Sequence, residues 1–113
     1  MKQKPKNIIL CGFMGSGKTT VGRRLAQKTH MEFLDMDHYI EEREGRTIAD
    51  IFAQDGEETF RRMETEAARE LASRRGLIIA SGGGTLLRLQ NVKIFRKSGV
   101  TVLLDTPIGL IQE

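Results

Sequence analysis

The sequence has little of several features on which common protein functions depend. It contains one cysteine, Cys11, so no internal disulfide can form, and we expect this thiol to be buried and reduced. Five Phe and one Tyr occur, and no aromatic cluster lies beside a basic patch, which argues against a base-stacking surface for nucleic acid. The net charge is only +3, a small basic excess that suits an anionic small ligand.

Long hydrophobic runs are also missing. The apolar stretch after the basic residues MKQKPKN is short and leads directly into a glycine-rich motif, so we expect neither a signal peptide nor a membrane span there. We therefore expect a cytoplasmic protein that binds no membrane. The length of 113 residues, 39% of them hydrophobic, fits one globular domain over residues 1–113.

Short apolar runs alternate with helical patterns along the chain. The apolar runs predict buried strands over 7–11, 31–37, 77–80 and 100–105. Helical patterns are predicted over 18–29, 39–43 (ending at Gly45), 48–55 (capped by Thr47 and ended by Gly56), 57–75 and 89–97, with a further start at Thr106 and Pro107. This alternation predicts a mostly parallel α/β sheet whose two faces are covered by helices.

The segment GFMGSGKT, residues 12–19, matches the phosphate-binding pattern G-x-x-x-x-G-K-[ST] between a predicted strand and a predicted helix. Glycines let backbone N–H groups turn inward around an anion, and the following helix adds its positive N-terminal end. Lys18 can reach the β- and γ-phosphates of a nucleotide, and Thr19 can offer its hydroxyl to Mg²⁺. A dinucleotide-binding loop is excluded because Thr20 stands where the third glycine of G-x-G-x-x-G would be.

Acids and glycines follow the other predicted strands. Asp35 and Asp37 come after the second strand, residues 82–84 are three glycines after the third, and Asp105 ends the fourth. Because ligands gather at the carboxyl ends of parallel strands, these groups should converge beside the phosphate-binding loop. The two aspartates could hold a metal and accept a proton from a hydroxyl, or they could simply cap the next helix. The glycines could admit a ligand or serve as a turn, and Asp105 could hold metal-bound water or begin a helix.

Two neighbouring arginines, Arg61 and Arg62, lie early in the long predicted helix. Glu57, Glu58 and Glu64 lie within one turn of them. From this pattern alone, solvated ion pairs along the helix are the favoured interpretation.

Three segments together resemble the shikimate kinase family: GFMGSGKTTVGRRLA, FLDMDHYIEEREGRTIADIFAQDGEETFRRMETE and SGGG. The resemblance follows the family in order and spacing over nearly the whole chain. It implies a three-layer α/β/α P-loop kinase fold with a parallel sheet in the order 2-3-1-4-5. The fifth strand, the lid with its arginine, a second carboxylate-binding arginine and the adenine-contacting loop are expected to be absent, which argues against turnover by these 113 residues alone.

The resemblance also implies the reaction and its partners. It is the transfer of the ATP γ-phosphoryl group to the 3-hydroxyl of shikimate, with Mg²⁺ as cofactor, and a monomer is expected. Two alternatives stay open: another small-metabolite kinase, such as a gluconate kinase, and a non-catalytic module that binds ATP or phosphate.

The site residues follow from the same resemblance. The ATP phosphates would lie on Gly15, Ser16, Gly17, Lys18, Thr19 and Thr20, and Mg²⁺ would be held by Thr19 and Asp35. Shikimate would be held by Asp37, Arg61, Gly82, Gly83 and Gly84. Lys18 and Asp37 would be the catalytic residues, with Asp37 as the candidate base. Arg61 would bind the shikimate carboxylate and be oriented by Glu64, whereas Asp105 is not a usual site residue of the family.

Overall fold

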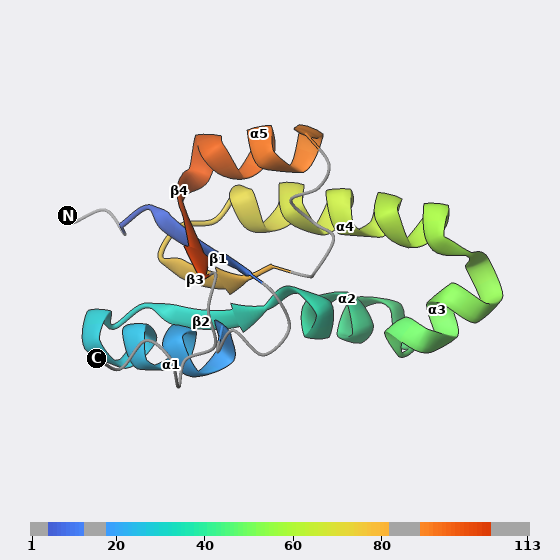
Figure 1. Ribbon diagram of the computed structural model, residues 1–113, viewed down its shortest axis with the longest axis horizontal. Helices are drawn as coiled ribbons and strands as arrows, with labels where there is room; N and C mark the ends of the chain where they lie inside the picture. The colour runs from blue at the N-terminus through green and yellow to red at the C-terminus, as the bar shows by residue number, and fades with distance from the viewer. Residues whose placement is uncertain (1–4, 13–17, 82–88, 105–113) are drawn as a thin grey trace.

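A computed structural model describes residues 5–12, 18–81 and 89–104 (Figure 1). Along the chain it contains β1 (Asn7–Gly12), α1 (Lys18–Thr29), β2 (Glu32–Asp35), α2 (Met36–Glu44), α3 (Ile48–Asp55), α4 (Glu57–Ala72), β3 (Leu77–Ala80), α5 (Leu89–Ser98) and β4 (Gly99–Leu104). The predicted alternation of strands and helices is confirmed.

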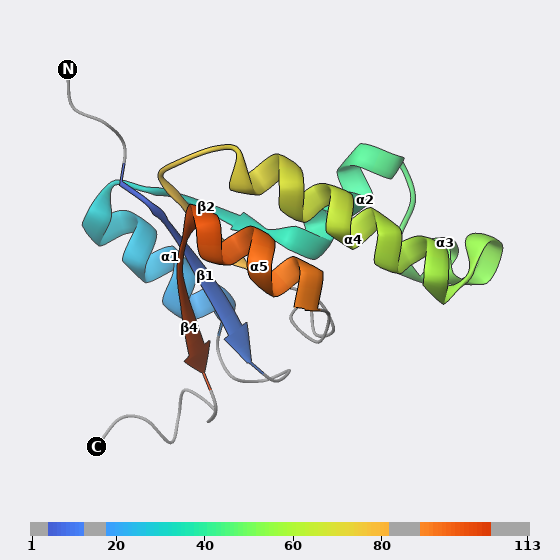
Figure 2. The ribbon, with the colours of Figure 1, turned by 90° about the horizontal axis from the view of Figure 1, so that it is seen from above.

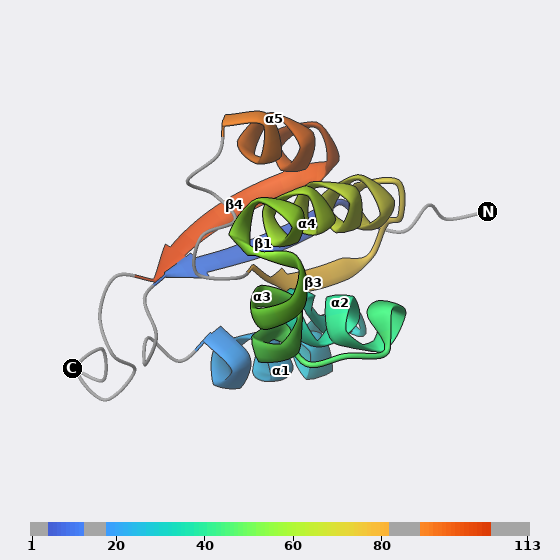
Figure 3. The ribbon, with the colours of Figure 1, turned by 90° about the vertical axis from the view of Figure 1, so that its right-hand side faces the viewer.

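The strands form one parallel sheet in the order β2-β3-β1-β4. Figure 3 shows α4 and α5 on one side of this sheet and α1 on the other. Seen from above, α4 and α5 run side by side over the strands (Figure 2). The expected three-layer α/β/α architecture is therefore confirmed, and the four strands follow the expected order. Because all strands are parallel, their carboxyl ends lie at one edge of the sheet.

The core cluster joins the sheet strands β1 and β3 to the helices α2, α3, α4 and α5. All four residues of β3 are buried, and Ile9 and Leu10 of β1 are completely buried. Small residues allow close packing in this core. Ala67 and Ala68 of α4 are both fully buried, and they belong to the same cluster as Ile9 of β1 and Ile79 of β3. On the opposite face, a Cβ placed on Gly22 of α1 would lie 2.3 Å from the Phe33 ring, so only glycine allows this approach of α1 to β2.

A buried asparagine joins the amino ends of β1 and β3. The Asn7 side chain donates to the main-chain oxygens of Leu71 and Arg74, at 3.3 and 2.9 Å. Its Oδ1 accepts the N–H of Leu77 at 3.0 Å. Because a buried amide is costly unless it is hydrogen-bonded, these three bonds fix where α4 turns back into β3.

Most predicted helix ends are correct for local reasons. Gly45 ends α2 in the left-handed conformation (φ 68°), and the Thr47 hydroxyl caps α3 by accepting the N–H of Asp50 at 3.1 Å. The predicted helix over 57–75 was too long, because α4 ends at Ala72 and the Ser73 hydroxyl bonds back to Glu70. The helix α5 ends one residue later than expected, and β1 also ends one residue later. The strand β4 begins one residue earlier than expected and extends to Leu104, while position 105 lies outside the described residues.

The second strand is the clearest error of the sequence interpretation. It was predicted over 31–37 but covers only Glu32–Asp35, and α2 begins at Met36. The cause is Asp35 itself, whose carboxylate accepts the His38 N–H at 3.2 Å and caps the helix. Asp37 consequently lies in the first turn of α2 and not in a strand.

The burial of Cys11 and the lengths of the helices can be compared with what the composition led us to expect. Cys11 is half-buried and not fully buried, and its Sγ donates to the Val102 carbonyl at 3.6 Å. The pKa of this thiol is raised, because the effect of burial outweighs the opposing effect of the positive charge of Lys18. Over residues 5–12, 18–81 and 89–104, no helix is long and apolar enough to cross a membrane.

Candidate functional site

The candidate site lies at the carboxyl edge of the sheet, where β1, β2 and β3 end beside one another. Asp35, the last residue of β2, pairs with Ala80, and Ala80 pairs with Leu10 of β1. The helix α1 begins at Lys18, whose ammonium lies 3.1 Å from the main-chain oxygen of Gly12, the last residue of β1. The parallel register therefore brings the ends of β1, β2 and β3 to one place.

Lys18 lies between the ends of β1 and β3. Its ammonium donates to the main-chain oxygens of Gly12, at 3.1 Å, and Ser81, at 3.0 Å. An ammonium group has three N–H donors, so one remains for a phosphate oxygen. The two main-chain oxygens thus hold a flexible side chain at the carboxyl edge of the sheet.

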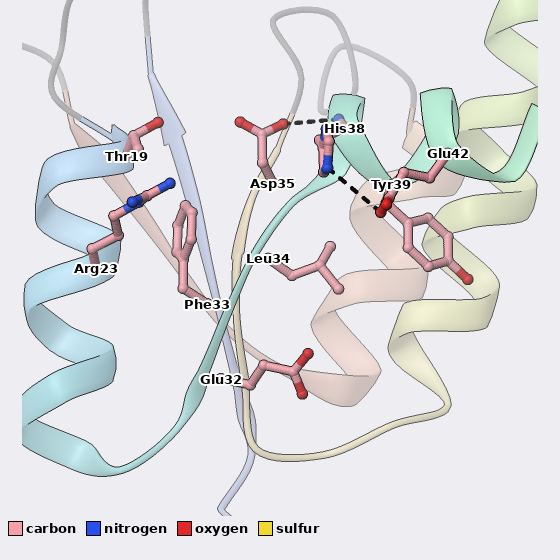
Figure 4. A pocket seen from close by; sticks show the side chains of 9 residues that line it. All are labelled: Thr19, Arg23, Glu32, Phe33, Leu34, Asp35, His38, Tyr39 and Glu42. Atoms are coloured by element: carbon pink, nitrogen blue, oxygen red, sulfur yellow. Dashed lines mark hydrogen bonds and ion pairs between the residues drawn. The ribbon is translucent and has the colours of Figure 1, made fainter. Parts of the chain in front are cut away.

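Thr19 and Asp35 line one cavity of about 450 Å³ between α1, β2 and α2. Figure 4 shows the Thr19 hydroxyl, from the first turn of α1, and the Asp35 carboxylate, at the end of β2, directed toward each other across the opening. A hydroxyl and a carboxylate are ligands that Mg²⁺ accepts, and this ion commonly takes its other ligands from water and phosphate. The two residues therefore fit the predicted magnesium site. The part of the chain that the structure describes has no group of three or more His, Cys, Asp and Glu that could hold a metal ion.

Asp37 lies in an environment that favours its neutral form. Burial raises the pKa of the Asp37 carboxyl above its ordinary value. The negative charges of Asp35 and Glu64 raise this pKa further, and the positive charge of Lys18 lowers it. The structure thus brings Asp37 within electrostatic reach of Asp35, Lys18 and Glu64 of α4. A raised pKa makes a carboxylate a better proton acceptor, which is the property expected of a base.

Arg61 of α4 has a partly buried side chain. Its guanidinium donates to Glu64 Oε1 at 2.8 Å and to Glu57 Oε2 at 3.2 Å, and it lies 5.6 Å from the centre of the Phe60 ring. The Glu57 side chain is 67% exposed, whereas that of Glu64 is 1% exposed. The solvated pairing favoured from the pattern is therefore correct for Glu57 and wrong for Glu64. Pairing with the buried Glu64 fixes the direction of the guanidinium, as the family resemblance implied.

Arg62, the neighbouring arginine, has a different setting. Its Nη2 donates to the Thr59 hydroxyl at 3.2 Å, and its side chain is exposed. The structure thus separates two adjacent arginines that the sequence pattern treats alike.

A contact between α2 and α4 was not predicted. The Tyr39 hydroxyl donates to Glu70 at 2.6 Å, and Arg43 forms ion pairs with Glu66 at 3.3 Å and with Glu70 at 3.2 Å. This network fixes the helix that carries Asp37 against the helix that carries the arginines. The i,i+4 spacing of Tyr39 with Arg43 and of Glu66 with Glu70 is its only sequence signal, and it becomes informative only once the two helices are known to be neighbours.

Several predicted residues lie outside the described part of the chain. They are Gly15, Ser16 and Gly17 of the phosphate-binding loop, Gly82, Gly83 and Gly84, and Asp105 with Thr106 and Pro107. Thr20 is described and lies exposed in the first turn of α1.

Comparison with known proteins adds an independent line of evidence. The family model described as "Shikimate kinase" matches residues 14–113. A shikimate kinase from Sulfurihydrogenibium sp. is 45% identical over 106 residues, which are 94% of this chain and 64% of that protein. The solved shikimate kinase from Acinetobacter baumannii in complex with shikimate is 47% identical, with a TM-score of 0.87 over 94% of this chain and 59% of that one. The shikimate kinase structure from Aquifex aeolicus is 35% identical, with a TM-score of 0.85 over 93% and 62%. The chain thus spans less than two thirds of the length of these relatives.

Proposed function

The chain belongs to the shikimate kinase family, and from this premise we propose that its protein transfers the γ-phosphoryl group of ATP to the 3-hydroxyl of shikimate. The observation that carries the proposal is the convergence of Lys18, Asp35 and Asp37 at one edge of the sheet, where the charges of Lys18 and Asp35 both act on the Asp37 carboxyl. The solved relative bound to shikimate supports the choice of acceptor, because it is 47% identical and superimposes with a TM-score of 0.87. These groups divide into a nucleotide half and an acceptor half.

The nucleotide half consists of residues 15–20 and Asp35. Gly15, Ser16, Gly17 and Thr20 would cradle the ATP phosphates together with Lys18, whose third N–H donor can point to a phosphate oxygen. Thr19 and Asp35 would hold Mg²⁺, which when bound neutralises charge on the β- and γ-phosphates. Asp35 can do so while it caps α2, since one of its oxygens accepts the His38 N–H and a carboxylate has further lone pairs.

The acceptor half consists of Asp37, Arg61 and the glycines Gly82, Gly83 and Gly84. Asp37 would accept the proton of the 3-hydroxyl, a role favoured by its raised pKa. Arg61 would bind the shikimate carboxylate through the donors that now reach the exposed Glu57, while Glu64 keeps the guanidinium in place. The main chain at Gly83 would contact the shikimate hydroxyls. No step requires a covalent intermediate on the protein, so positioning and charge neutralisation supply the catalysis.

The proposal is tested by measuring the affinities for MgATP and for shikimate separately, and then ADP release in a coupled assay. Arg61→Ala should weaken shikimate binding about 10- to 100-fold, the value of a charged hydrogen-bonded contact, and leave MgATP affinity unchanged. Asp37→Asn should lower turnover and shikimate use and spare MgATP. Arg62→Ala is the matched control, because it removes the adjacent arginine from the same helix and should change neither affinity.

Three results would contradict the proposal. An equal loss of MgATP and shikimate affinity in Arg61→Ala would show that the residue does not act on the acceptor. Turnover with gluconate but not with shikimate would assign a different small-metabolite kinase. Binding of MgATP without any shikimate binding would indicate a nucleotide-binding module.

A further inference from the structure

Ser81 is the residue at which the chain leaves the sheet after β3. It is 3% exposed, and its N–H donates to the Leu10 carbonyl at 2.9 Å, which continues the β1–β3 ladder one residue beyond Ala80. Its hydroxyl donates to the same carbonyl at 3.0 Å. Two bonds from one residue therefore hold the end of β3 against β1, and the second depends on the side chain.

The Ser81 carbonyl is one of the two oxygens that hold the Lys18 ammonium, at 3.0 Å; the other belongs to Gly12. These oxygens come from the ends of two neighbouring strands. The position of the ammonium therefore depends on how firmly the end of β3 is held beside β1. A lysine side chain has four rotatable bonds. If the ammonium were not held in advance, the side chain would lose much conformational freedom on binding a phosphate.

We propose that Ser81 is a positioning residue for the nucleotide phosphates: its buried hydroxyl fixes the end of β3, so that its carbonyl holds the Lys18 ammonium at the phosphate site. The inference rests on the proposed use of Lys18 in phosphate binding. It does not require that shikimate be the acceptor. Ser81 itself touches neither the nucleotide nor the acceptor in this role, because it acts through Lys18.

The test measures MgATP affinity by calorimetry for the 113-residue chain and its variants. Ser81→Ala removes one buried hydrogen bond and should weaken MgATP about fivefold, as expected for the net value of such a bond. Ser81→Thr keeps a hydroxyl and should retain the affinity of the unmodified chain. Ser73→Ala is the matched control, because that hydroxyl also donates to a main-chain oxygen, of Glu70 at 2.6 Å, but lies at the end of α4 before β3 begins. It should leave MgATP affinity unchanged.

A double-mutant cycle separates positioning from simple stabilisation. In a Lys18→Ala background, Ser81→Ala should cause no further loss of MgATP affinity, because its effect passes through the ammonium. The same fold loss in both backgrounds, or no loss in Ser81→Ala, overturns the inference. If Ser81→Ala does not fold, Ser81→Cys, whose thiol is a weaker donor, should give an intermediate loss, and full affinity in that variant overturns the inference as well.

The same data distinguish this inference from the proposed function. A chain that binds MgATP and shows the Ser81 effect, but does not use shikimate, contradicts the proposed function and supports the inference. A chain that phosphorylates shikimate but whose MgATP affinity does not change in Ser81→Ala supports the proposed function and contradicts the inference. A chain that does not bind MgATP contradicts both.

Discussion

Arg61 and Glu64 allow a stability prediction that needs no substrate. The Glu64 side chain is 1% exposed and lies 2.8 Å from the Arg61 guanidinium, which is 20% exposed. Removing one partner of a buried ion pair leaves a charge in a poorly solvated place, at a cost of about 3 to 5 kcal/mol. Because Arg61 retains some contact with water, we expect Arg61→Ala to lower the free energy of unfolding by about 3 kcal/mol, at the lower end of that range.

The mechanism predicts a partial recovery in a second variant. In Arg61→Ala/Glu64→Gln, a neutral amide replaces the buried carboxylate of this pair, so we expect the double variant to be about 1 to 2 kcal/mol more stable than Arg61→Ala alone. The stability of each variant is measured by urea unfolding at pH 7, with the denaturant dependence checked for two-state behaviour.

The control for this experiment is Arg62→Ala, which removes an exposed arginine bonded to Thr59 and should change stability by no more than about 0.5 kcal/mol. The reasoning is refuted if Arg61→Ala costs no more than this control. It is also refuted if adding Glu64→Gln makes Arg61→Ala less stable. The contacts of the Glu64 carboxylate would then stabilise the fold by more than the burial of its charge destabilises it.

Three further outcomes follow from other contacts. The raised pKa of Asp37 means that its carboxyl favours folding below its ordinary pKa of 3.8 and that this contribution is lost as the pH rises through the raised value. Asp37→Asn should therefore be more stable than the unmodified chain at pH 7 and lose that advantage near pH 3, as thermal melts at both pH values would show; equal melting differences at both would contradict it. Tyr39→Phe removes the 2.6 Å bond to Glu70 but keeps the ring, so it should lower stability by about 1 kcal/mol and weaken shikimate more than MgATP, and a selective loss of MgATP would count against the assigned role of α2. Gly22→Ala places a Cβ 2.3 Å from the Phe33 ring and should cost about 1 to 3 kcal/mol in urea unfolding, whereas no measurable loss would mean that α1 can move away from β2.

Local chemistry explains most of what the sequence predicts correctly. The helix over 18–29 matches its prediction at both ends, and Thr47 and Gly45 cap their helices through contacts within a few residues. Such signals need no knowledge of the rest of the fold. The error at Asp37 arose because two local signals compete over 35–37: an apolar run that favours a strand and an aspartate that caps a helix. The observed cap bond from His38 to Asp35 shows that capping prevails.

The roles of charged residues are much less local. Arg61 and Arg62 are identical in type, adjacent in sequence and surrounded by the same glutamates, yet only Arg61 meets the buried Glu64. Which of them faces inward depends on the rotation of α4 against the sheet and α2. A pattern of i,i+3 and i,i+4 pairs cannot distinguish them, because both arginines satisfy it.

Three features could be predicted from the amino-acid sequence: the phosphate-binding segment, the alternation of strands and helices, and the family resemblance. Each depends on residues close together along the chain. Which side chains contact one another depends instead on how the strands and helices pack in the folded chain. Lys18 and Ser81 are 63 residues apart and are joined because β1 lies beside β3, and Tyr39 and Glu70 are 31 residues apart and are joined because α2 packs against α4. Strand order and helix packing are set by burial of the whole apolar surface at once, so contacts of this kind become visible only when the chain is folded.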